Sequence, residues 1–248
     1  MIRLHDERHP PLRHRRRDTP AEARVLQLEL TRAADYPDFT EAFLRRQHAC
    51  YSRFRSEAAA APHQKRTSWK GVFLVAATDY ATGELAGGVG VYERHEDAPL
   101  PVELAIGKTS AIGVALNRWS DERVVELSGL WVEEQWRRTG LSELLMLVAM
   151  SSAKHLGATK AVGFSHQHVL EFYKTIGLVP DESVGDYLYP DEQYVTTFIW
   201  GDLKKLTTAP AAARKEIERH TRQMGRERPI YWTGSPRLRV TPSAAQAG

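Results

Sequence analysis

One strand–loop–helix unit constrains the fold of this 248-residue chain more than any other feature. The unit starts with Val124–Val132, an almost uninterrupted apolar run of the length of a buried strand. It ends with residues 141–156, whose leucine, valine and alanine side chains fall on one helical stripe before a capping Gly157. A buried strand joined by a short loop to an amphipathic helix predicts a sheet with helices packed on it.

The sequence before and after this unit predicts the other strands of the sheet and the helices that flank it. Strands are expected where apolar residues alternate or run together, at residues 26–30, 72–77, 85–92, 160–164 and 194–200. Helices are expected over residues 38–54, 102–117, 169–176 and 211–224. A turn at residues 79–83 joins two of the strands into an antiparallel hairpin. This order predicts a mixed α/β (α+β) fold with a six- to seven-stranded sheet flanked by helices and a C-terminal helical extension.

The surplus of positive charge lies outside the predicted domain. The net charge is +3, and the first residues carry a group of arginines: Arg3, Arg8, Arg13, Arg15, Arg16 and Arg17. We expect a disordered basic arm over residues 1–20, a single domain over 21–205 and a helical extension with a tail over 206–248. The extension is predicted to pack on the domain through Ile230, Tyr231 and Trp232. No aromatic residues interleave the arginines for base stacking, so nucleic acid is not an expected partner.

Composition excludes several classes of protein. The longest apolar run, residues 144–150, is far shorter than the roughly 18 residues that a membrane span requires, so no membrane association is expected. The first residues do not form the apolar stretch of a secretion signal. Cys50 is the single cysteine, so no intramolecular disulfide forms and a cytoplasmic location is expected. No residues have metal-ligand spacing, and we expect no metal.

The loop between the central strand and the helix has the composition of an anion site. A short glycine-containing loop turns backbone N–H groups toward one point, and the helix N-terminus adds the positive end of its dipole. Arg137 and Arg138 add charge beside Gly140. These residues favour a phosphate or pyrophosphate group. The alternative is an ordinary turn with a solvated arginine pair.

Three segments together resemble the GNAT (Gcn5-related N-acetyltransferase) superfamily. They are residues 130–132, the loop 137–142 and the later helix 171–178. The family's acyl-CoA loop reads Gln/Arg-x-x-Gly-x-Gly/Ala, and Ser142 takes its last position here. Its later helix carries a Phe-Tyr-x-x-x-Gly-Phe-like stretch, in which Leu178 replaces the aromatic residue. The resemblance covers residues 70 to 200 and implies the GNAT fold, whose mixed sheet is mostly antiparallel.

The resemblance also implies the donor, acetyl-CoA or another acyl-CoA. In the family, the loop amides hold the pyrophosphate and the end of the strand pairs with the pantetheine arm. The thioester lies in a slot between this strand and the strand at 160–164. The residues carried over as donor-binding are Leu130, Trp131, Val132, Arg137, Arg138, Thr139, Gly140, Leu141 and Ser142.

Glu126 is the candidate general base. A period of two places it on the same strand face as Ser128, Leu130 and Val132. A carboxylate in so apolar a strand is costly unless it is paired, hydrated or catalytic. It also precedes Gly140 by the spacing at which histone-acetylating GNAT members carry their catalytic glutamate. The alternative is a glutamate hydrogen-bonded at a bulge or strand edge.

Tyr173 is the candidate general acid. In many GNAT members this tyrosine points at the thioester sulfur and protonates the departing thiolate. It also falls on the apolar stripe of its helix, so the alternative is a core tyrosine with its hydroxyl at a hydrated rim. His166 and His168 lie near the expected slot, and we interpret them as solvated residues at the start of this helix.

The resemblance implies an N-acyltransferase that moves an acyl group, acetyl before others, from acyl-CoA to a primary amine by direct attack on the thioester. The acceptor is an amine-bearing small molecule or an amino acid.

Residues 125–132 with the insertion 93–122 resemble, more weakly, acyl-homoserine-lactone synthases and N-acyl amino acid synthases, which take long acyl chains from acyl carrier protein. Gly129 stands where they usually have arginine. A non-catalytic acyl-CoA-binding protein is the third alternative. Homodimerisation through a strand edge or the C-terminal extension is left open.

Overall fold

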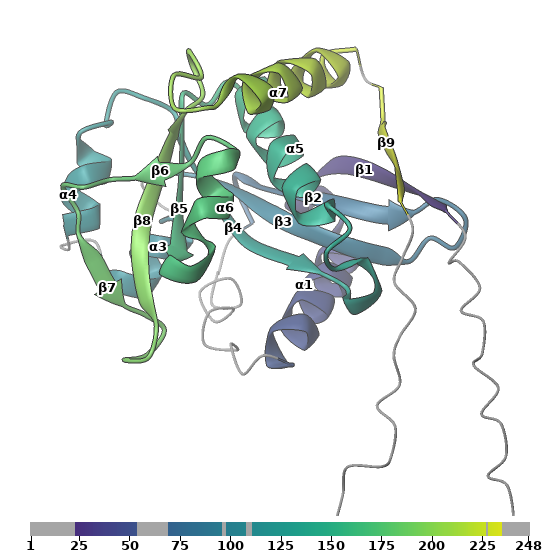
Figure 1. The fold of residues 1–248 in the computed structure, drawn as a ribbon, viewed down its shortest axis with the longest axis horizontal. Helices are drawn as coiled ribbons and strands as arrows, with labels where there is room; N and C mark the ends of the chain where they lie inside the picture. Colours follow the sequence, from purple (N-terminus) through teal and green to yellow (C-terminus); the bar gives the residue numbers. More distant parts are fainter. Residues whose placement is uncertain (1–22, 54–68, 96–97, 108–110, 227, 235–248) are drawn as a thin grey trace, which may run out of the picture.

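The computed structural model describes residues 23–53, 69–95, 98–107, 111–226 and 228–234 (Figure 1). The predicted arm at residues 1–20 and the predicted tail at 241–248 lie outside these residues. None of the described helices combines the length and the apolar composition needed to cross a membrane.

Within the described residues, nine strands form one sheet in the order β6-β8-β5-β4-β3-β2-β1-β9, with β7 also paired to β8. Every pair is antiparallel except β4 and β5, which are parallel. The strands are β1 Arg24–Arg32, β2 Val72–Asp79, β3 Leu85–Glu93, β4 Val124–Val132, β5 Lys160–His166, β6 Val179–Pro180, β7 Asp186–Leu188, β8 Val195–Asp202 and β9 Ile230–Gly234.

All six strands expected from the sequence are present, and three more extend the sheet. β6 and β7 have two and three residues, too few for an alternation to be read from sequence. β9 comes from the predicted C-terminal extension and pairs with β1. Ile230 is buried on it, whereas the exposed Tyr231 points outward, as alternation along a strand requires.

Helices cover both faces of the sheet. They are α1 Pro37–Ser52, α3 Pro101–Ile106, α4 Ala111–Asn117, α5 Leu141–His155, α6 Leu170–Thr175 and α7 Ala211–Met224, with short 3-10 turns η1 Ala33–Asp35, η2 Glu134–Trp136 and η3 Gln167–Val169. The single helix expected over 102–117 is two short helices, because Gly107 takes a φ of 98° and ends the first. α7 lies alongside α5 (Figure 1).

Two apolar cores form, one on each face of the sheet. One core packs the stripe of α5, including Leu141 and Leu145, against Val75 and Val125 of the strands, with Ile217 of α7 beneath it. The other core joins α1, α3 and α4 to the opposite face through residues such as Phe43, Val102, Ile112 and Trp131. The central strand β4 contributes to both cores, which accounts for its nearly continuous apolar sequence.

A β-bulge in β4 changes which side chains share a face. Gly90 pairs with Ser128 but Gly88 pairs with Trp131, so β4 carries one extra residue at Gly129 and Leu130. Gly129 takes a φ of 74°, which glycine adopts without strain.

The expectation that Glu126, Ser128, Leu130 and Val132 share one face is therefore wrong. Before the bulge, Val125 and Leu127 face the α5 core, and after it Val132 does so. Trp131 faces the α1 core instead. The extra residue at the bulge inverts the alternation that the sequence alone suggests.

β4 and β5 pair only at their beginnings. Val124, Val125 and Glu126 lie opposite Lys160, Ala161 and Val162. The paired register ends at Glu126, and beyond it the two strands separate. The opening between them contains a cavity lined by polar and aromatic side chains.

Candidate active site

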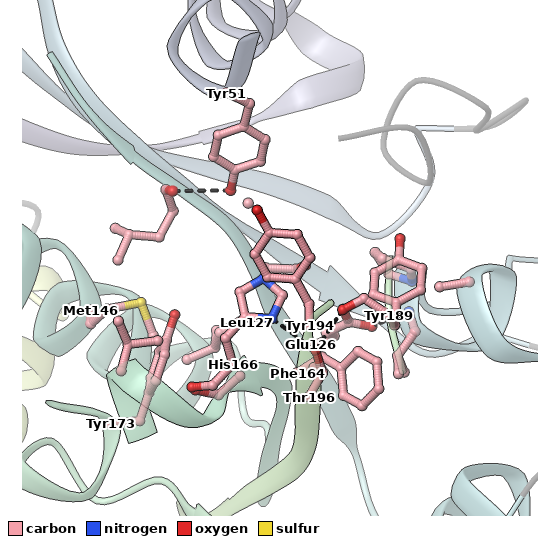
Figure 2. A pocket seen from close by; sticks show the side chains of 18 of the residues that line it. Tyr51, Glu126, Leu127, Met146, Phe164, His166, Tyr173, Tyr189, Tyr194 and Thr196 are labelled. Carbon is pink, nitrogen blue, oxygen red and sulfur yellow. Dashed lines mark hydrogen bonds between the residues drawn. The ribbon is translucent and has the colours of Figure 1, made fainter. Parts of the chain in front are cut away.

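A cavity of about 480 Å³ lies where β4 and β5 separate (Figure 2). The floor comes from β4 and β5, and the walls come from α1, α3, α6 and the segment before β8. The polar and aromatic side chains that line it are Tyr51, Glu126, Ser128, Phe164, Ser165, His166, His168, Tyr173, Tyr189, Tyr194 and Thr196. The cavity is therefore mostly aromatic, with a single carboxylate among these side chains.

Glu126 lies at the bottom of this cavity with 1% of its surface exposed. One carboxylate oxygen, Oε2, accepts a hydrogen bond of 2.8 Å from the backbone N–H of Val102, in the first turn of α3. This bond offsets part of the cost of burying a charge. The carboxylate thus accepts a hydrogen bond from α3 and lines the cavity at once.

Tyr189 shows the influence of the Glu126 charge. Burial, and secondly the negative charge of Glu126, raise the pKa of the Tyr189 phenol to about 12. The phenol is therefore protonated at neutral pH and able to donate a hydrogen bond within the cavity.

Tyr173 lies on α6 and is half-buried in the opposite wall, near Met146 (Figure 2). Burial raises the pKa of its phenol to about 12, so it carries its proton at neutral pH. Its ring also packs against the α5 core. The side chain is thus both part of the core packing and part of the cavity wall.

Side chains of α1 donate hydrogen bonds to the backbone carbonyls that β4 exposes at and after its bulge. Gln47 Nε2 donates to the carbonyl of Gly129 at 2.7 Å, and the Tyr51 hydroxyl donates to that of Leu130 at 3.0 Å. The Cys50 thiol donates to the carbonyl of Val132 at 3.3 Å. The lone cysteine therefore has a structural place in the contact between α1 and β4. A carbonyl oxygen has two lone pairs, so these groups keep acceptor capacity for a ligand.

The predicted donor loop follows the end of β4. Gly140 has a φ of 93° and precedes α5 without a side-chain cap, which leaves the first N–H groups of the helix for another acceptor. Arg138 also has a positive φ, 61°. Thr139 Oγ1 donates to the carbonyl of Trp136 at 2.6 Å and fixes the loop to this buried residue of the η2 turn.

The remaining donor-binding candidates fall into two groups, those whose side chains are buried in the cores and those whose side chains are not. Trp131 and Leu141 are buried in the cores, so only their backbones can contact a ligand. Arg137 donates to the carbonyl of Val132 at 3.3 Å and contacts Cys50 Sγ at 3.4 Å, which aligns its guanidinium with the end of β4. Arg138 is exposed, and Ser142 is half-buried in the first turn of α5.

The structure thus brings Glu126, Leu130 and Tyr173 to one cavity, with the loop 137–142 following the end of β4. The sequence did not single out Tyr51 or Thr196. His166 is the last residue of β5 and lines the cavity, so its interpretation as a helix-start residue is wrong. The β5–β8 pairing extends to His166 opposite Thr196, a long-range contact with no local signal.

In the described part of the chain, no cluster of histidine, cysteine and acidic side chains could hold a metal ion.

Comparison with known proteins identifies the family. The model of the acetyltransferase (GNAT) family matches residues 36–178, more than half of the chain. The chain belongs to the GNAT family. Two uncharacterized mycobacterial proteins, Rv1356c of Mycobacterium tuberculosis and Mb1391c of Mycobacterium bovis, are each 28% identical to it over 142 residues, 55% of this chain and 53% of theirs. The chain therefore spans about half the length of the curated relatives it matches.

Solved structures with the same fold include three acyl-transferring enzymes. The N-acyl amino acid synthase FeeM from uncultured soil microbes has a TM-score of 0.54 and 13% identity, covering 79% of this chain and 99% of that one. The CoA-dependent acyl-homoserine lactone synthase BjaI has a TM-score of 0.54 and 12% identity, covering 81% and 90%. An acyl-CoA N-acyltransferase from Pseudomonas aeruginosa has a TM-score of 0.50 and 13% identity, covering 71% and 99%. At these identities the likeness concerns the GNAT fold.

Proposed function

We propose that this GNAT protein transfers an acyl group from acyl-CoA to a primary amine, with acetyl as the preferred group. One observation carries the proposal: the opening between β4 and β5 holds a buried carboxylate, Glu126, and a protonated phenol, Tyr173, in the walls of one cavity. Acyl transfer to an amine requires a group that removes a proton and a group that supplies one.

The donor is proposed to lie along the end of β4. The uncapped first turn of α5 after Gly140 supports binding of a pyrophosphate, and the backbone of Leu130, Trp131 and Val132 supports pairing with a pantetheine arm. This arrangement would direct the thioester toward the cavity. Arg137, Arg138, Thr139, Leu141 and Ser142 complete the proposed set, with Leu141 contributing its backbone alone.

In the proposed reaction, the acceptor arrives as an ammonium ion and the Glu126 carboxylate removes one proton, directly or through water. The free amine attacks the thioester carbonyl, forming the C–N bond. Tyr173 gives its proton to the sulfur as the C–S bond breaks. The high pKa of the Tyr173 phenol keeps this proton in place until the thiolate forms.

The lining favours a cationic amine as acceptor. Among the described residues that line the cavity there is a carboxylate but no lysine or arginine. An ammonium group fits a carboxylate surrounded by the faces of tyrosine rings. An amino acid acceptor would bring its own carboxylate close to Glu126 without a cation to pair with it.

A second candidate is a long-chain N-acyl amino acid or acyl-homoserine-lactone-type synthase. The shared fold of FeeM and BjaI and the volume of about 480 Å³, larger than an acetyl group needs, favour it. The carboxylate-only charge of the described lining is evidence against it.

A panel assay tests these alternatives. Acetyl-CoA, longer acyl-CoAs and an acylated carrier protein are each combined with arylalkylamines, polyamines and amino acids, and thiol release is followed. We expect turnover with acetyl-CoA and a cationic amine lacking a carboxylate. Turnover with long acyl chains and amino acids alone would establish the second candidate. A rise in Tm with acyl-CoA but no turnover in any combination would establish a non-catalytic binding protein.

Glu126→Gln tests the chemical step. The amide oxygen keeps the hydrogen bond from Val102, so the fold and acyl-CoA binding should be retained. We expect kcat to fall about 100-fold or more, because an amide accepts no proton at neutral pH. Unchanged turnover near pH 7 would show that Glu126 is not the base.

A further inference from the structure

His166 is held by a hydrogen-bond chain that fixes which ring nitrogen carries the proton. Thr196, its partner residue across β5 and β8, donates its hydroxyl proton to the carbonyl of Tyr189 at 2.7 Å. A hydroxyl has one proton, so Thr196 Oγ1 acts as the acceptor in its 2.8 Å contact with His166 Nδ1. Nδ1 therefore carries the imidazole proton, and Nε2 carries a lone pair.

The surroundings keep this ring neutral. Burial is the largest influence and lowers the pKa of His166 below its ordinary value, and His168 lowers it further. His168 is exposed and stacks on the ring with 5.7 Å between centroids. Asp191 acts in the opposite direction and is weaker. The other titratable groups that line the same cavity are Tyr51, Glu126, Tyr173, Tyr189 and Tyr194.

The free nitrogen belongs to the proposed active site. The His166 ring lines the cavity together with Glu126 and Tyr173 (Figure 2). Tyr194 packs on one side of the ring, with 5.0 Å between centroids. Within the described residues, His166 forms its hydrogen bond through Nδ1, and Nε2 forms none. A neutral imidazole with a fixed tautomer and an open Nε2 is a competent proton acceptor.

The reaction can use a second proton acceptor. An ammonium ion loses two protons on its way to an amide, one before attack and one once the C–N bond has formed. Glu126 has a carboxylate that takes one proton at a time, and its Oε2 is engaged with α3. A different group must therefore receive the second proton unless Glu126 first discharges the one it holds.

We propose that His166 is a catalytic residue whose Nε2 receives the second proton of the acceptor nitrogen. This inference rests on the proposed acyl transfer. The C–N bond forms and the C–S bond breaks, the nitrogen gives up two protons, and the sulfur gains one from Tyr173. Glu126 and His166 then each release one proton to solvent and Tyr173 regains one from solvent, so one proton is released per turnover.

His166→Asn is the decisive variant. The Asn amide donates to Thr196 from the position of Nδ1 but has nothing at the position of Nε2. We expect kcat to fall about 100-fold with the cationic amine as acceptor, while acyl-CoA binding and the KM for the amine change less than threefold. The wild-type kcat should rise with pH through an ionisation whose pKa lies below the ordinary histidine value of about 6.5. The plot of kcat against pH for the variant should lack this rise.

His155→Asn is the matched control, the same change at an exposed histidine at the end of α5, and it should keep wild-type kinetics. His166→Gln repeats the test if the Asn variant does not fold. The proposal would be overturned if a folded His166 variant kept the wild-type kcat or the wild-type rise of kcat with pH. A variant that lost only affinity for acyl-CoA would overturn it as well. Absence of thiol release by the wild-type protein with every donor and amine would instead refute the proposed function itself.

Discussion

Single side chains in this protein show how burial sets protonation. Tyr173 and Tyr189 are held as neutral phenols and His166 as a neutral imidazole, each chiefly because burial disfavours the charged form. Glu126 is buried as well, yet a backbone N–H of α3 compensates its carboxylate. The cavity thus combines protonated phenols, a neutral imidazole and a carboxylate at neutral pH, and burial widens the pH range over which the phenols and the imidazole keep these states.

His220 on α7 offers a test of the same physics outside the cavity. It is 1% exposed, and burial, followed by the charge of Arg219, lowers its pKa to about 4. Arg219 also donates to its Nε2 at 3.0 Å, and Nδ1 is buried without a partner among the described residues.

We expect the folded state to lose stability between pH 6.5 and pH 4. Over this window the unfolded chain protonates His220 and the folded chain does not, so the free energy of unfolding falls by on the order of 3 kcal/mol. His220→Leu should flatten this part of the pH dependence in urea unfolding, and His155→Leu, at an exposed position, should not. Equal pH dependence in the wild-type and His220→Leu proteins would contradict the prediction.

At the scale of elements, the bulge in β4 determines the site. It directs Trp131 into the α1 core, exposes carbonyls to Gln47, Cys50 and Tyr51, and lies between Glu126 and the end of the strand where we propose that the donor binds. A regular strand would place these groups on other faces.

Gly129→Ala should therefore damage function more than stability alone explains. A residue other than glycine at a φ of 74° costs about 1–2 kcal/mol. Gly83→Ala is the matched control, since Gly83 has a φ of 73° in the β2–β3 turn and open space around it. We expect a similar drop in Tm for both variants but lost thiol release for Gly129→Ala alone. Equal activities would show that the bulge geometry is not needed.

Particular residues show how far the sequence predicts this molecule. Periodicity located six strands and the α5 stripe, because burial against a sheet imposes regular spacing on side chains. The bulge at Gly129 is invisible to that reasoning, since one residue with positive φ inverts an alternation without changing composition. His166 was misinterpreted and Cys50 left without a role because their partners, Thr196 and Val132, are 30 and 82 residues away in the chain.

Considered as a whole, the molecule ties its C-terminal region to the proposed donor-binding loop. α7 packs on α5, and β9 pairs with β1 at the edge of the sheet. Trp232 of β9 packs on the buried Trp136, with 6.1 Å between ring centroids, and Trp136 directly precedes the loop 137–142. The last described strand thus supports the proposed pyrophosphate site from behind.

Trp232→Ala should lower the free energy of unfolding by about 2 kcal/mol through lost aromatic packing. It should also weaken acyl-CoA binding several-fold, because Trp136 and the loop attached to it lose support. Tyr231→Ala, at the exposed neighbouring position, provides the comparison in calorimetric titrations with acyl-CoA. Unaltered affinity in Trp232→Ala would show that the loop keeps its shape without β9.

The short parallel contact between β4 and β5 has an evolutionary consequence. Backbone pairing joins the two parts of the sheet over Val124–Glu126 and ends there, so the width of the opening is left to the side chains of the surrounding helices. Substitutions on α1, α3 or α6 can then enlarge or narrow the substrate space while every strand keeps its register. Such a scaffold can diversify in the acyl groups and amines it accepts at little cost to its folding.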